Sequence, residues 1–355
     1  MSAPPSQMES LRTGAALSRQ EETRVVRVGG EHAWDLLDRE VTCDLYLRDG
    51  QARPGLLLHR DGRVAADLTV LCADETFWLL LSGEGAASAV DRLGDAAHAG
   101  EAVEVIDLTG DLAVIGLDGP FAWEALAAHA GRGVIGLPLL SFFTMDGGTL
   151  CLRDGRLGEY GYRFVASAAH ATALEDALRD AGDRVRLPLG AASLLTRQAA
   201  MLENHVFCAD LEGRSDLDAG ELQLGWRLSA DKAGPGMAAI RERHTAGTAR
   251  RTVTFRTARH TTDRGIALDG APVGQVLRLE PCLHGPGFVG LGAVPERMAH
   301  PGISSLHVGG VPMLTVSPPL VANRSLYVNA QHHRYAARDE IRFPADAATS
   351  RAPRE

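Results

Sequence analysis

The sequence lacks a long uninterrupted hydrophobic run. Its longest apolar stretch, residues 134–143, is interrupted by Pro138 and is much shorter than the roughly 20 residues that a membrane-spanning helix needs. The first twenty residues mix Ser, Pro, Gln, Glu and Arg without an apolar core, so we expect no secretory signal peptide there. These absences favour a cytoplasmic protein that does not bind membranes.

The sequence also has few cysteines. Their number is odd and no two are spaced as Cys-x-x-Cys: Cys43, Cys72, Cys151, Cys208 and Cys282. This pattern excludes a disulfide framework or a cysteine-based zinc site and is typical of reduced thiols in the cytoplasm. Two adjacent histidines, His332 and His333, cannot share one face of a regular element, so no metal site is expected.

A surplus of positive charge is absent as well. The chain has 36 Lys and Arg against 45 Asp and Glu, a formal net charge of -9. That balance argues against a general binder of nucleic acid or anionic membranes. An apolar content of 45% is ordinary for a globular protein, and 355 residues predict two or three packed units.

The order of strand and helix patterns predicts the division into units. Residues 1–20 look like a flexible leader, and residues 21–240 mix short strands, Asp-Gly turns and amphipathic helices. After a segment rich in Gly and Pro, residues 245–325 contain short strands at barrel-like spacing. Residues 336–355 are rich in Ala, Arg, Asp and Pro, so we expect a disordered tail.

One formal nucleotide-binding pattern is present but lacks its context. Gly285, Gly287 and Gly290 form a G-x-G-x-x-G, which binds a dinucleotide only when a helix follows it directly. A strand pattern from Phe288 to Val294 follows instead. The pattern therefore predicts a hairpin of the barrel.

The most informative stretch is His59 to Cys72, HRDGRVAADLTVLC. A turn at Asp61-Gly62 precedes alternating apolar residues of a strand, which carries one acid, Asp67, between apolar or small neighbours. Burial would raise the pKa of this carboxyl and suit it to acid–base chemistry. The alternative is an edge strand on which Asp67 points to solvent.

Five segments occur in the order found in one known superfamily. They are residues 26–44 (VRVGGEHAWDLLDREVTCD), 62–70 (GRVAADLTV), 115–126 (IGLDGPFAWEAL), 158–164 (GEYGYRF) and 221–226 (ELQLGW). Together they resemble the folate-dependent aminomethyltransferase superfamily, which includes the T-protein of the glycine cleavage system, over residues 12–325. The resemblance implies a divergent member with an α+β fold. That fold is a T-protein-like cloverleaf of antiparallel sheets with flanking helices, two interleaved α+β subdomains in the folate-binding core, and a C-terminal β-barrel.

The resemblance also implies site residues. The catalytic acid of the family falls on Asp67, and the acid before it is replaced by Ala66. The family glutamate that grips the pterin is replaced by Arg163, which can only donate hydrogen bonds. Two further family positions, an arginine and a tyrosine, fall on Met201 and Pro54. The cofactor-binding positions that follow are Leu68, Thr69, Val70, Glu159, Tyr162, Arg163 and Glu203.

Three of these positions have structural alternatives. Tyr162 can be a core aromatic of a strand, Glu203 can belong to a helix C-terminus, and Arg163 can be a surface residue.

The implied activity is tetrahydrofolate-dependent transfer of a one-carbon unit (methyl, methylene or aminomethyl) to or from a small molecule, with Asp67 orienting the reacting amine. A second hypothesis keeps an enzyme on the same fold but without folate, with Arg163 binding an anionic substrate. A third is a non-catalytic protein that binds folate or another metabolite. The glycine-cleavage relative needs a lipoyl-carrying partner, but no segment here identifies a docking surface for one.

Overall fold

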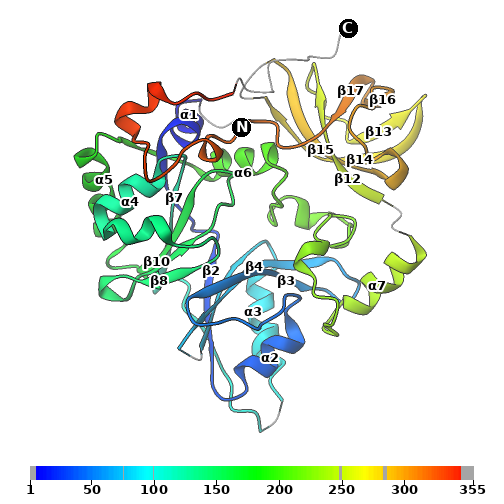
Figure 1. The fold of residues 1–355 in the computed structure, drawn as a ribbon. Coiled ribbons are helices and arrows are strands. Elements are labelled where there is room, and N and C mark those ends of the chain that lie inside the picture. The colour runs from blue at the N-terminus through cyan, green and yellow to red at the C-terminus, as the bar shows by residue number, and fades with distance from the viewer. Residues whose placement is uncertain (1–4, 75, 99, 248–249, 283–285, 345–355) are drawn as a thin grey trace.

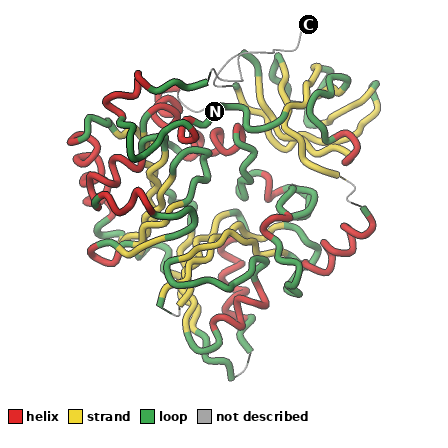
Figure 2. The backbone as a smooth tube through the Cα atoms, in the orientation of Figure 1, coloured by secondary structure: helices red, strands yellow, loops and turns green. Residues whose placement is uncertain are grey.

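The computed structural model describes residues 5–74, 76–98, 100–247, 250–282 and 286–344. Figure 1 shows three β-rich parts: a five-stranded sheet, a six-stranded sheet and a closed six-stranded barrel. The smooth tube in Figure 2 shows that helices lie on the outer sides of both sheets, and that loops fill much of the centre. Among the described residues, no helix combines the length and apolar character that a membrane crossing requires.

The five-stranded sheet carries Asp67. Its strands, in spatial order, are β3 (Gln51–Leu58), β4 (Val64–Ala73), β5 (Thr76–Ser82), β2 (Arg24–Gly29) and β6 (Glu104–Asp107), all antiparallel to their neighbours. Helices α2 (Ala33–Glu40) and α3 (Ala86–Asp95) pack on one face, where Leu36 and Leu93 meet Leu68 and Val70 of β4. Because side chains alternate along a strand, Asp67 and Thr69 face the opposite side.

The six-stranded sheet packs on that opposite side. Its spatial order is β11 (Leu189–Ala191), β1 (Ala15–Arg19), β7 (Leu112–Asp118), β10 (Gly161–Ser167), β9 (Leu150–Arg153) and β8 (Phe142–Thr144). Helices α4 (Ala122–Ala130) and α5 (Ala171–Arg184) cover its outer face. Leu71 and Leu80 from the first sheet pack with Leu152 and Val165 from the second.

The expectation of a flexible leader is wrong for the part of it that the structure describes. Residues 5–20 contain helix α1 (Pro5–Thr13) and strand β1, which lies inside the sheet between β7 and β11. Met8, Leu11 and Leu17 are buried. The apolar residues of α1 and β1 form short patterns between polar residues. Strand β1 can therefore be recognised only from its pairing with strands that are distant in the sequence.

The barrel closes in the order β12 (Arg250–Thr257), β15 (Phe288–Pro295), β14 (Ala271–Pro281), β13 (Gly265–Leu268), β16 (Leu306–Val308) and β17 (Val311–Val316). Four of the five strands predicted in this region are confirmed, whereas the fifth, expected over residues 306–314, is a hairpin of β16 and β17. Strand β15 follows the G-x-G-x-x-G pattern and pairs antiparallel with β14, as the hairpin interpretation requires, although Gly285 lies outside the described residues.

The remaining helices connect these parts. Strand β11 leads directly into helix α6 (Leu194–Glu203), whose first turn is capped by Ser193. Helix α7 (Met237–Ala246) precedes the barrel. Short 3₁₀ turns cover Arg132–Gly136, Asp146–Gly148, Glu212–Arg214, Gly225–Arg227, Glu296–Met298, Arg324–Leu326 and Tyr335–Glu340.

The expectation of a disordered tail is wrong for residues 336–344. The 3₁₀ turn Tyr335–Glu340 is followed by Ile341 and Phe343, which pack against the core of the six-stranded sheet. The Tyr335 ring meets the ring of Phe121 edge-on at 5.4 Å. Residues 345–355, the rest of the predicted tail, lie outside the described residues.

Candidate functional site

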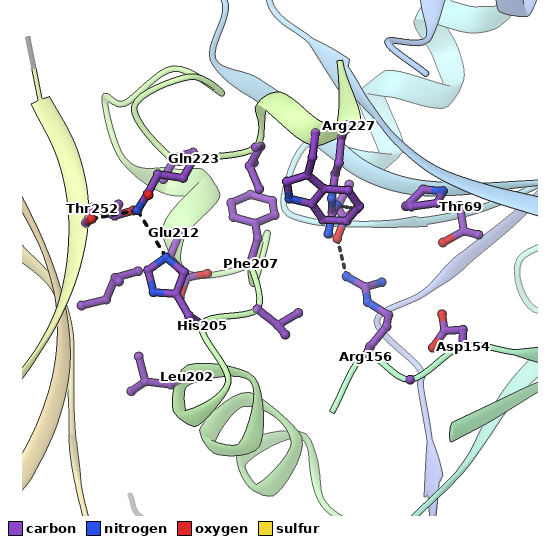
Figure 3. Close-up of a pocket in the computed structure, with 18 of the residues that line it drawn as sticks. Thr69, Asp154, Arg156, Leu202, His205, Phe207, Glu212, Gln223, Arg227 and Thr252 are labelled. Carbon is purple, nitrogen blue, oxygen red and sulfur yellow. Dashed lines mark hydrogen bonds and ion pairs between the residues drawn. The ribbon is translucent and has the colours of Figure 1, made fainter. Parts of the chain in front are cut away.

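A cavity of about 360 Å³ lies where the two sheets meet the barrel, and we call it the central cavity. Its volume is in the range of small-molecule sites. The lining comes from both sheets, the loops 202–227 and the barrel: Pro54, Asp67, Thr69, Leu139, Leu140, Asp154, Gly155, Arg156, Leu202, His205, Val206, Phe207, Glu212, Leu222, Gln223, Leu224, Trp226, Arg227, Thr252 and Leu291. Figure 3 shows how several of these side chains converge.

Asp67 lies on the wall of this cavity with 1% of its surface exposed. Its Oδ1 accepts a hydrogen bond from Nη1 of Arg227, and its Oδ2 accepts one from Nη2 of Arg156. Burial alone would raise the pKa of Asp67, but the charges of Arg156 and Arg227 outweigh burial and lower that pKa. The solvent-facing alternative is therefore wrong, and so is the expectation of a raised pKa.

The two arginine side chains that contact Asp67 differ in solvent exposure. The Arg227 side chain is 4% exposed, and its guanidinium lies over the rings of Trp226 at 4.7 Å and Phe207 at 5.9 Å. The Arg156 side chain is 25% exposed and comes from the loop between β9 and β10 (Figure 3). Two cations around one carboxylate leave this end of the cavity with a surplus of positive charge.

Arg163 does not face the central cavity. It is 3% exposed on β10, forms an ion pair with Asp154, and donates from Nη2 to Oγ1 of Thr69 at 2.9 Å. Burial lowers the pKa of its guanidinium, and the partner carboxylate opposes that effect. The alternative of a surface arginine is wrong.

A second pocket of about 50 Å³, which we call the small pocket, adjoins the central cavity and shares Asp154 and Arg156 with it. Arg163, Arg197 and Asp118 also line it. Burial, together with the charge of Asp154, raises the pKa of Asp118 to about 8. Asp118 is therefore mostly protonated at neutral pH.

This raised pKa predicts how stability depends on pH. The folded state holds the Asp118 proton up to about pH 8, whereas the unfolded chain releases it near 3.8. The contribution of this group to stability is therefore lost progressively as pH rises from about 4 to about 8. We expect Asp118→Asn to flatten this decline, measured as urea-unfolding free energies at pH 5 and pH 8; an unchanged decline would contradict the assignment.

Five further residues among the expected cofactor-binding positions do not line the central cavity, which corrects the sequence-based expectation. Leu68 and Val70 pack beneath α2 and α3, and Tyr162 is a core aromatic of the six-stranded sheet. Glu159 accepts hydrogen bonds from the backbone and hydroxyl of Ser325, and Glu203 pairs with Arg12 at 2.9 Å. Both glutamates therefore connect the terminal segments to the core. Thr69, in contrast, does line the cavity.

The predicted site did not include two polar residues at the other end of the cavity, His205 and Gln223, although His205 could be read from the sequence either as a pocket residue or as part of a helix C-terminus. His205 Nδ1 lies 2.8 Å from Oγ1 of Thr254, and its Nε2 lies 3.5 Å from Nε2 of Gln223 (Figure 3). Both have left-handed backbones, with φ of 54° for His205 and 61° for Gln223. Such strain in non-glycine residues is concentrated at functional sites. Gln223 lies within the fifth landmark segment, residues 221–226, but no role was predicted for it.

No sequence motif identified the two arginines that pair with Asp67. Arg227 directly follows the fifth landmark segment, and Arg156 lies two residues before the fourth. In the part of the chain that the structure describes, no group of three or more His, Cys, Asp or Glu residues is arranged to hold a metal ion.

Comparison with known proteins identifies the family. The model of the GCVT N-terminal domain matches residues 5–232. The chain is 30% identical over 212 residues to an aminomethyltransferase of Chlorobaculum parvum, covering 58% of this chain and 57% of that protein. It is 29% identical over 277 residues to an aminomethyltransferase of Geobacillus kaustophilus, covering 74% of this chain and 72% of that protein. The first curated relatives are thus matched over 57–60% of their own length.

One solved structure has the same fold. The glycine cleavage system aminomethyltransferase T from Bartonella henselae superimposes with a TM-score of 0.78 at 22% identity, covering 90% of this chain and 89% of that chain. The α+β fold with its C-terminal barrel is therefore confirmed. Because the family model matches residues 5–232, which is more than half of the chain, the chain belongs to the GCVT N-terminal domain family, as a divergent member.

Proposed function

We propose that this protein is a one-carbon transferase of the aminomethyltransferase type, with Asp67 as the central residue of its site. The observation that carries the proposal is the position of Asp67, a buried acid on strand β4 that reaches the wall of a cavity of about 360 Å³. The relatives named aminomethyltransferase support the same class of reaction.

The surroundings of Asp67 define its role. Its lowered pKa keeps the carboxyl ionised at neutral pH, so it accepts hydrogen bonds and does not act as the resting proton donor. Arg156 and Arg227 use part of its accepting capacity, since an ionised carboxylate has about four lone-pair sites. The remaining sites can orient a substrate amine and stabilise positive charge that develops on it, an effect that burial strengthens.

Tetrahydrofolate is the carrier that the family implies, and the central cavity fits it better than the small pocket does. The small pocket, at about 50 Å³, has room for only about three to five waters and not for a pterin ring. The central cavity offers apolar walls at Phe207, Leu224 and Trp226, and guanidinium donors at Arg156 and Arg227 for carbonyl or carboxylate oxygens. Reduced folate bound there would carry the one-carbon unit.

A second candidate is an enzyme on the same fold that acts on an anionic small molecule without folate. The surplus of positive charge around Asp67 favours this alternative, because an anion would compensate it. The exchange of the family's pterin-gripping glutamate for Arg163 counts against folate as well, but Arg163 is paired with Asp154 and does not line the central cavity, so it would not bind the anion there itself.

Calorimetric titration of tetrahydrofolate and its 5-methyl and 5,10-methylene forms separates the two candidates. We expect at least one form to bind with one-to-one stoichiometry. We also expect Trp226→Ala to weaken that binding about three- to tenfold, because it removes an aromatic wall. The matched control is Trp34→Ala, an exposed tryptophan on α2 that does not line the cavity.

The outcomes are distinct. Absence of binding by all three folates would exclude folate dependence and leave the anionic-substrate enzyme. Folate binding together with a biological function that Asp67→Ala leaves intact would indicate a non-catalytic binding protein.

A further inference from the structure

The small pocket, which adjoins the central cavity and shares Asp154 and Arg156 with it, has the features of an anion site of its own. We propose that it binds a small planar oxyanion of about three heavy atoms, for which formate is the probe. The site does not depend on the proposed one-carbon transfer, because its donors come from Arg163 and Arg197 and not from the partners of Asp67.

The small pocket is lined by buried guanidinium donors that lack acceptors in the described part of the chain. Arg163 and Arg197, 3% and 7% exposed, both line the small pocket. Nε of Arg163, and both Nε and Nη2 of Arg197, have no hydrogen-bond partner among the residues that the structure describes. A buried N–H without an acceptor destabilises the fold, and more so on a charged group. These donors therefore require oxygen atoms that the chain does not supply.

Two of the acids that line the small pocket are already paired with arginines, and Asp210 is a further acid of its lining. Asp154 pairs with Arg163, and Glu22 pairs with Nη1 of Arg197 at 2.7 Å. Asp118 is mostly protonated below about pH 8, so it is a donor there and not a competing anion. A planar oxyanion can accept from the guanidinium N–H groups and from the Asp118 hydroxyl together.

The volume of the small pocket limits the size of the anion that it can hold. A volume of about 50 Å³ holds about three to five water-sized groups, at roughly 10–15 Å³ each. Formate has three heavy atoms and fits this space. Acetate adds a methyl group that must share this small volume with buried charged side chains. The four heavy atoms of acetate would take up most of this volume, so the pocket is expected to prefer formate and to exclude carboxylates larger than acetate.

The test is an NMR titration of ¹³C-labelled sodium formate into the full chain at pH 7 and constant ionic strength. We expect saturable line broadening with a dissociation constant on the order of 1 mM at the tightest, since a three-atom ligand makes few contacts. Labelled acetate should bind at least about tenfold more weakly. Equal binding of acetate, or no saturable formate binding, would overturn the proposal without the need for any variant.

Two variants locate the site. Arg197→Met should weaken formate binding by about tenfold or more, because it removes the charged donors. The control is Arg92→Met. Arg92 also has two buried nitrogens without partners and one carboxylate neighbour, Glu40 at 3.4 Å, but it does not line the pocket. Formate affinity that is unchanged in Arg197→Met, or lost equally in Arg92→Met, would contradict the assignment.

The affinity should also depend on pH. Asp118 is surrounded by Asp154, Arg156, Arg163 and Arg197, and the small pocket is lined in addition by the acids Glu22 and Asp210. Ionisation of Asp118 replaces a donor with a negative charge, so formate affinity should fall as pH rises through about 8. An affinity that rises over this range would contradict the proposed role of the Asp118 hydroxyl.

Discussion

Asp67→Asn is expected to lower the rate of one-carbon transfer by about 10²- to 10⁴-fold. The amide keeps the shape of the carboxylate but removes the negative charge that stabilises a developing cation. The substitution would also leave Arg156 and Arg227 without a counter-charge, and the Arg227 side chain is only 4% exposed. We therefore expect a loss of about 3 kcal/mol in unfolding free energy as well, measured by urea denaturation.

A second variant separates catalysis from folding. Combining Asp67→Asn with Arg227→Met removes the uncompensated buried cation, so stability should largely recover while transfer stays lost. The matched control is Asp218→Asn. Asp218 is also buried and paired with an arginine, Arg243 at 2.6 Å, but does not line the central cavity. If the double variant regained both stability and activity, Asp67 would have only a structural role.

Arg163→Glu is expected to destabilise the protein by about 4 kcal/mol, a large share of a typical folding free energy. The substitution restores the residue type expected from the family but places a buried carboxylate against Asp154, with Asp118 nearby. Because both new neighbours are acids, the protein should unfold at lower urea concentration, and the deficit should grow as pH rises and Asp118 ionises.

Two comparisons isolate the charge effect. Arg163→Met removes the cation without adding an acid, so it should cost less than Arg163→Glu. Adding Asp154→Asn to Arg163→Glu removes the repulsion and should recover about half of the lost stability. If Arg163→Glu were as stable as the original chain, the ion pair between Arg163 and Asp154 would contribute nothing to folding.

The limits of the sequence reasoning are clearest at the predicted site residues. The alternation around Asp67 predicted strand β4, and the structure confirms that strand. The neighbours of Asp67 along the strand are apolar or small, but in the fold its carboxylate is buried against Arg156 and Arg227. The same alternation shows why Leu68 and Val70 cannot line the cavity, since neighbours on a strand point to opposite faces. Glu159 and Glu203 were misassigned because their partners, Ser325 and Arg12, lie 166 and 191 positions away.

Those parts of the fold in which neighbouring segments pair with each other were predictable from local sequence patterns. Turn residues and period-two patterns in the C-terminal region predicted the strands of the barrel, because hairpins form between neighbouring segments. Helix α1 and strand β1 were missed because β1 pairs with β7 and β11, which lie far away in the chain. Their short apolar patterns only become informative once the sheet is known.

The sequence by itself determined the family pattern, the strand that carries Asp67 and the exchange of a carboxylate for Arg163. Only the tertiary structure decided the protonation state of Asp67, because its partners Arg156 and Arg227 lie 89 and 160 positions away in the sequence. Burial alone predicts a raised pKa, whereas two guanidiniums in contact lower it. Charges act through space over a few ångströms, so the protonation of Asp67 depends on which distant side chains the fold brings to it.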